Sequence, residues 1–104
     1  MVKMTVPKFA HLLQNQVANA TGTVRGGEFK HFRHFCDLLA EHYTGVNVDI
    51  PSTCSSMEVA NELKKLGNIN MPSGMLRKLF DEQVELLRSA NIENLHFNPI
   101  LSGA

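Results

Sequence analysis

Apolar residues recur at helical spacing in four stretches of the chain. The pattern predicts amphipathic helices over Pro7 to Ala20, Glu28 to about Thr44, Ser56 to Leu66 and Pro72 to about residue 89. The second stretch is apolar around more of its circumference than the others, so we expect it to be the central helix. Four helices around one core give every apolar stripe a partner, so we predict an all-α fold, a compact four-helix domain over residues 1–104.

Residues that favour helix ends mark three of these boundaries. Pro7 lies in the first turn of the first predicted helix, where its missing backbone donor does no harm. Ser55 and Glu58 have the spacing of a capping box and predict the start of the third helix. Gly67 is expected to end that helix.

Two stretches fall outside the helical period. The segment from Val46 to Ile50 alternates apolar and polar residues, but no other segment is an equally good pairing partner, so we predict an extended loop ending at Pro51. The segment from Ile92 to Leu101 is apolar without a period. We expect it to form an extended tail that packs along the bundle or contacts another chain.

Composition and charge narrow the class of protein. A chain of 104 residues with 43% apolar content fits one domain with one core. Its 10 basic and 10 acidic side chains cancel, which argues against attachment to nucleic acid or anionic membranes by bulk charge. No apolar run approaches the roughly 18 residues of a membrane span, and the opening residues are too polar for a signal peptide. We therefore expect a cytoplasmic protein.

The sequence contains no catalytic signature. Cys36 reads as a buried helix residue and Cys54 as a loop thiol, and neither belongs to a CxxC pair. His31 and His34 are spaced to present two imidazoles to a metal, but no further ligands complete a site. There is no nucleophile elbow, phosphate loop or dinucleotide fingerprint. We expect no enzymatic activity, no metal and no cofactor.

The function that remains is binding to other proteins. We predict a non-enzymatic interaction module, an adaptor, inhibitor or assembly factor, that binds another protein or itself as a homodimer. Basic residues dominate the first third of the chain and acidic residues follow, a polarity that favours oriented docking. The expected contact surfaces are a basic edge and the apolar tail, made of Lys30, Arg33 and His34, and of Leu95, Phe97, Ile100 and Leu101.

The alternative function is DNA binding. The predicted helices at about 56–66 and 72–89 resemble a helix-turn-helix in outline, with four cations near the joint: Lys64, Lys65, Arg77 and Lys78. The would-be recognition helix also carries Asp81, Glu82 and Glu85, which phosphates would repel. The segment from Arg25 to Phe35 mixes cations and aromatic rings, but its phenylalanines have the spacing of a core stripe. We therefore rank nucleic-acid binding below protein binding.

Overall fold

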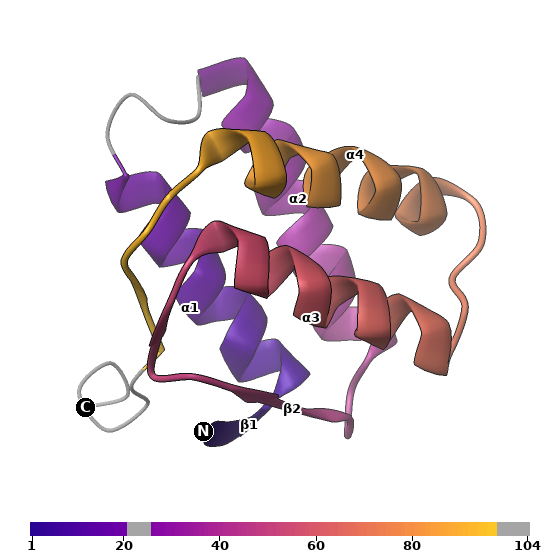
Figure 1. Cartoon of the computed structure of the whole chain (residues 1–104). Coiled ribbons are helices and arrows are strands. Elements are labelled where there is room, and N and C mark those ends of the chain that lie inside the picture. Colours follow the sequence, from indigo (N-terminus) through magenta and orange to yellow (C-terminus); the bar gives the residue numbers. More distant parts are fainter. Residues whose placement is uncertain (21–25, 98–104) are drawn as a thin grey trace.

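The computed structural model describes residues 1–20 and 26–97. Within these residues the chain forms four helices: α1 (Val6–Asn19), α2 (Gly26–His42), α3 (Ser56–Ile69) and α4 (Met75–Ala90). They make two antiparallel helical hairpins, α1 with α2 and α3 with α4, and the second hairpin lies across the first with α4 contacting α2 (Figure 1). The predicted four helices are confirmed.

Local capping sets the starts of two helices. Thr5 Oγ1 accepts a hydrogen bond from the backbone N–H of Lys8 at 3.4 Å and caps α1. Ser55 Oγ accepts from the N–H of Glu58 at 3.2 Å and caps α3 as the sequence predicts.

Glycines act differently from the sequence prediction in the α3–α4 hairpin. The predicted end of α3 at Gly67 is wrong, because the helix continues to Ile69. The ring of Phe80 packs against α3 at Gly67, where a Cβ would lie 3.5 Å from a ring carbon, an ordinary van der Waals distance. The predicted start of α4 at Pro72 is also wrong. The helix begins after Gly74, whose φ of 66° and ψ of −136° suit glycine and few other residues.

A first small sheet joins the N-terminus to the segment between α2 and α3. Strand β1 (Val2–Thr5) pairs antiparallel with β2 (Asn47–Ile50), with Val2 opposite Ile50. The prediction of an extended loop over residues 46–50 is therefore wrong. The pairing partner is the short N-terminal stretch, and the pair buries Met4 against the same core as Val48.

A second small sheet ties the C-terminal segment to the molecule. Strand β3 (Thr53–Cys54) pairs antiparallel with β4 (Leu95–His96), with Cys54 opposite Leu95. The N–H of Phe97 then donates to the carbonyl of Ser52 at 2.7 Å. The fold is mostly helical rather than strictly all-α. Cys54 is buried in a strand, so its prediction as a loop thiol is also wrong.

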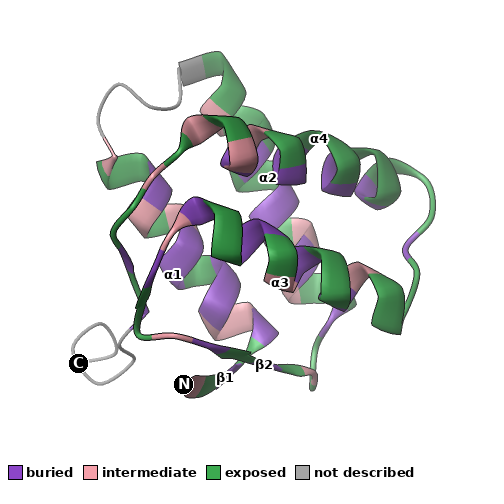
Figure 2. Ribbon diagram, in the orientation of Figure 1, coloured by how far each residue is buried: buried purple, intermediate pink, exposed green. Residues whose placement is uncertain are grey.

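The core lies between the two hairpins. Buried residues occupy the sides of the helices that face one another, and exposed residues the outer sides (Figure 2). Helix α2 packs against α1 and α4, and its Phe32, Phe35 and Leu39 are fully buried. The expectation that it is more enclosed than the other helices is not confirmed, because α1 and α4 each bury six residues. Phe80 of α4 meets Phe35 edge-on at 5.2 Å between ring centroids, and Tyr43 at 6.2 Å. These contacts fix the position of Phe80.

Candidate functional site

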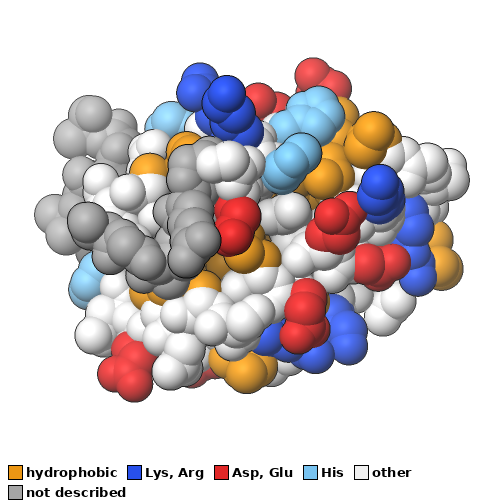
Figure 3. All heavy atoms as spheres, turned by 90° about the horizontal axis from the view of Figure 1, so that it is seen from above, with side chains coloured by type: hydrophobic (Ala, Val, Ile, Leu, Met, Phe, Trp, Pro, Cys, Tyr) orange, Lys and Arg blue, Asp and Glu red, His pale blue; other side chains and the backbone are white. Residues whose placement is uncertain are grey.

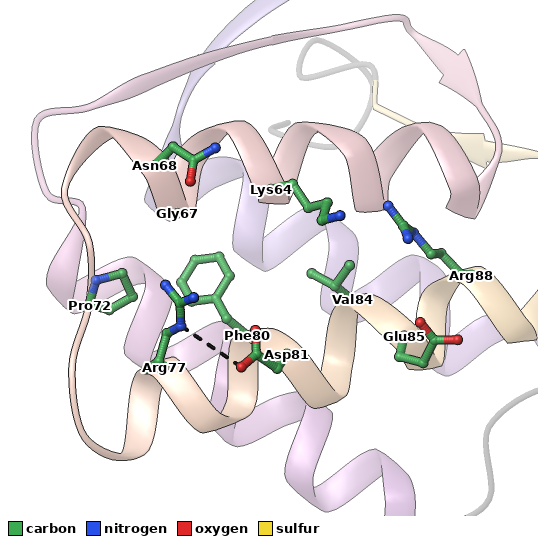
Figure 4. A pocket seen from close by; sticks show the side chains of 10 residues that line it. All are labelled: Lys64, Gly67, Asn68, Pro72, Arg77, Phe80, Asp81, Val84, Glu85 and Arg88. Carbon is green, nitrogen blue, oxygen red and sulfur yellow. Dashed lines mark ion pairs between the residues drawn. The ribbon is translucent and has the colours of Figure 1, made fainter.

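A groove runs between α3 and α4 (Figure 4). Its volume is about 220 Å³, below the roughly 300–1,000 Å³ of pockets that hold drug-sized ligands. It therefore suits one or two side chains of a docked segment. The residues that line it are Lys64, Gly67, Asn68, Pro72, Arg77, Phe80, Asp81, Val84, Glu85 and Arg88.

The wall beside α4 is apolar and rigid. The ring of Phe80 is 5% exposed and is held from behind by Phe35 and Tyr43. The hydroxyl of Tyr43 donates to the carbonyl of Asn70 at 3.1 Å, which fastens the end of α3 to the same aromatic group. The groove is thus preformed by core packing, which lowers the ordering cost of binding.

The charges in the groove are not balanced. Three cations and two carboxylates line it, and Arg77 Nε lies 3.8 Å from a carboxylate oxygen of Asp81 in a long ion pair. The side chains of Lys64 and Arg88 form no ion pair and no hydrogen bond with any described residue. The Nε of Arg88 is buried and has no acceptor there. Figure 4 shows the ammonium of Lys64 and the guanidinium of Arg88 pointing toward each other.

Replacement of Arg88 by methionine is expected to stabilise the protein. A buried donor without an acceptor costs about 1–3 kcal/mol, whereas a cation in the last turn of a helix contributes about 0.3–1 kcal/mol. Methionine keeps an apolar stem, so Arg88→Met should raise the unfolding free energy by roughly 1 kcal/mol. Urea denaturation at constant m-value measures it. A loss of 1 kcal/mol or more would show that the guanidinium has a structural partner.

Large apolar side chains lie exposed at the turn that ends the groove. Ile69 is 67% exposed, Met71 63% and Met75 60%. We call these three residues the apolar rim. Met75 has the helical spacing of the buried residues of α4, but it is exposed because it occupies the first turn of the helix directly after Gly74. Asn68 in the last turn of α3 and Pro72 in the following turn line the groove, so the rim residues are close to groove residues in sequence.

The residues predicted as a basic edge lie elsewhere. Lys30, Arg33 and His34 are all exposed on α2, and none of them lines the groove. Seen from above, Lys and Arg side chains lie among Asp, Glu and His side chains, with small apolar areas between them (Figure 3). The face of the molecule seen in Figure 3 therefore carries mixed charge.

The predicted apolar tail is partly core. Leu95 is 1% exposed and Phe97 is fully buried, with the Phe97 ring 5.4 Å from that of Phe9. Ile100 and Leu101 lie outside the described residues. The tail packs on its own domain as far as residue 97, so Leu95 and Phe97 are core residues and are not exposed to a partner.

The cations predicted for DNA binding divide into two groups. Lys64 and Arg77 line the groove, whereas Lys65 and Lys78 are exposed beside it. Lys65 pairs with Glu62 at 3.2 Å. Sequence reasoning missed Arg88, because one arginine in the last turn of an amphipathic helix carries no signal of its own. It also missed the rim, although Ile69 and Met71 stand outside the helical stripes.

The thiols are poorly suited to nucleophilic chemistry. Burial, and then the charge of Asp37, raises the pKa of the Cys36 thiol far above its ordinary value. Burial, with smaller contributions from Glu58 and Glu62, raises the pKa of Cys54 to about 11. Both thiols are therefore protonated near neutral pH.

In residues 1–20 and 26–97, no three His, Cys, Asp or Glu side chains are arranged to hold a metal ion. None of the described helices combines the length and apolarity needed to cross a membrane. No protein-family model matches the chain, and no curated protein or solved structure shows a significant match to it.

Proposed function

We propose that this chain is a non-enzymatic protein-interaction module, an adaptor, inhibitor or assembly factor, that docks a partner segment on the α3–α4 groove and its apolar rim. One observation carries the proposal: three large apolar side chains, each more than half exposed, stand at the end of a preformed groove that holds two unpaired cations. Single exposed apolar residues are common on protein surfaces, but a group beside a concavity is typical of an interface.

The residue types of the rim and the groove support docking of a peptide-like segment. Methionine is flexible and polarizable, and it is frequent on surfaces that adapt to a partner. Arginine and aromatic residues are enriched among the residues that dominate binding energy. The rim would supply apolar burial, and the groove would accept a side chain between α3 and α4.

The basic edge of Lys30, Arg33 and His34 stays in the proposal as a second contact surface. Because α2 is basic at this edge and carries Asp37 and Glu41 further along, it would orient a partner of mixed charge. A homodimer is one form that such docking would take.

Duplex DNA fits the groove less well than a protein segment. Asp81 and Glu85 share the groove with its cations and would face the phosphates. The helices α3 and α4 lie side by side in opposite directions (Figure 1), whereas the two helices of a helix-turn-helix cross at about 90–120°. The DNA-binding alternative stays a prediction, with Lys64, Lys65, Arg77 and Lys78 as its contacts.

The proposal is tested with the double variant Met71→Ser/Met75→Ser. Loss of two contact residues at about 1 kcal/mol each predicts at least a tenfold loss of partner binding. Affinity capture with quantitative mass spectrometry compares this variant with the parent chain. Met57→Ser is the matched control, because Met57 is an exposed methionine (47%) in the first turn of α3, at the opposite end of that helix from the rim.

Three outcomes would count against the proposal. In the first, Met57→Ser loses the captured proteins as completely as the rim variant does. In the second, the rim variant retains them. In the third, the parent chain captures no protein above background. Light scattering on the same samples detects a homodimer. A parallel titration with duplex DNA at low salt favours the alternative if binding is seen and falls when the four cations are neutralised.

A further inference from the structure

Two cations of the groove form no ion pair, although the carboxylates of Asp81 and Glu85 line the same groove. Lys64 on α3 and Arg88 on α4 line the same cavity and point toward each other (Figure 4), and neither pairs with a carboxylate in the described chain. The backbone-proximal N–H of the Arg88 guanidinium is buried without an acceptor. Two cations that line one cavity without an ion pair favour the binding of an anion from outside.

We infer that Lys64 and Arg88 together bind one carboxylate, supplied by an Asp or Glu side chain of the docked segment. This inference rests on the proposed function and adds the chemistry of the partner: an acidic residue next to apolar ones. The planar fork of a guanidinium matches a carboxylate with two parallel hydrogen bonds, and an ammonium adds a point charge from the other side. Bound between them, the carboxylate accepts hydrogen bonds from the terminal N–H groups of the Arg88 guanidinium and from the ammonium of Lys64.

The surroundings of the two cations favour a peptide side chain over a free ion. The groove in which Lys64 and Arg88 would bind the carboxylate has an apolar wall, formed by the ring of Phe80 and the side chain of Val84. The apolar rim stands at the other end of the groove, since Met75 and Arg88 lie at opposite ends of α4, about 20 Å apart along the helix axis. A segment that places a leucine-like residue beside an acidic one would contact both the cations and the apolar wall, whereas a free phosphate would use only the charges.

The test uses the full chain and two synthetic tripeptides with blocked ends, acetyl-Leu-Glu-Leu-amide and acetyl-Leu-Gln-Leu-amide. The NMR signal of the Arg88 Nε–H reports binding directly. The glutamate peptide should shift this signal saturably and bind at least tenfold more tightly than the glutamine peptide. Arg88→Met should abolish binding, and Lys64→Met should weaken it at least threefold, both followed through backbone amide signals of α3 and α4.

Lys65→Met is the matched control, since Lys65 is the next residue along α3 but pairs with Glu62 outside the groove. It should leave binding within twofold of the parent. Equal binding of the two peptides, or equal loss in Lys65→Met, would overturn the inference. Inorganic phosphate is titrated in parallel, and a site that binds phosphate but not the glutamate peptide would also overturn it. Urea denaturation of Arg88→Met shows whether the variant is folded, so a loss of binding in the folded variant is separated from unfolding.

The failure of this inference is distinguishable from failure of the proposed function. If the glutamate peptide binds but the rim variant captures every partner normally, the carboxylate site stands and the docking surface does not. If the rim variant loses its partners while Lys64→Met and Arg88→Met keep theirs, the docking surface stands and the carboxylate site does not.

Discussion

Replacement of Phe97 by alanine should destabilise the protein by about 3–5 kcal/mol, the usual cost of removing a buried aromatic side chain. Phe97 is fully buried and lies against Phe9 of α1, with 5.4 Å between ring centroids. Its N–H also donates to the carbonyl of Ser52, which anchors the segment after α4. Urea denaturation followed by circular dichroism measures the change, with parent and variant fitted at a common m-value.

The same variant decides between two roles for the C-terminal segment. If Phe97 contacted a partner rather than the core, Phe97→Ala would leave stability unchanged and reduce partner capture instead. His96→Ala is the matched control, because the neighbouring His96 is exposed. Its Nδ1 makes one long contact of 3.4 Å with Thr53 Oγ1, so the control should change stability by no more than about 0.5 kcal/mol.

The parts of the fold that depend on near neighbours were predictable from the sequence. The helical stripes and the caps at Thr5 and Ser55 involve residues three or four apart, so the pattern contains them directly. The pairing of Val2 with Ile50 does not have this property, because a strand of four residues gives a weak pattern and its partner is distant in sequence. The pairing of Cys54 with Leu95 was not predictable either, because its strands are short and distant in sequence.

The candidate site was predictable only in fragments. Lys64 and Arg77 attract attention as cations near a joint between helices, and both do line the groove. The importance of Arg88 depends on what it lacks, an acceptor for a buried N–H, and only the packed structure shows this. The spacing of Met75 fits the apolar stripe of α4, but a stripe does not show that the first turn of the helix extends beyond the core.

The second large effect on stability is expected at Ser56, a fully buried serine at the start of α3. Its Oγ accepts a hydrogen bond from the N–H of Ile92 at 2.9 Å, and its own N–H donates to the carbonyl of Ile92 at 2.7 Å. Ser56→Ala leaves the Ile92 N–H without this acceptor, which costs about 1–3 kcal/mol. The better helix propensity of alanine returns no more than about 0.5 kcal/mol. We therefore expect a net loss of about 2 kcal/mol in urea denaturation.

Ser55→Ala separates this role from ordinary helix capping. Ser55 accepts from the N–H of Glu58 within α3 alone, so its loss should cost about 1 kcal/mol and leave Ile92 untouched. Hydrogen exchange of the Ile92 amide should accelerate in Ser56→Ala and keep the parent rate in Ser55→Ala once global stability is taken into account. Equal acceleration in both variants would mean that the two serines act only through the start of α3. Selective acceleration would show that the Ser56 hydroxyl joins α3 to the segment after α4, the connection that brings Leu95 and Phe97 into the core.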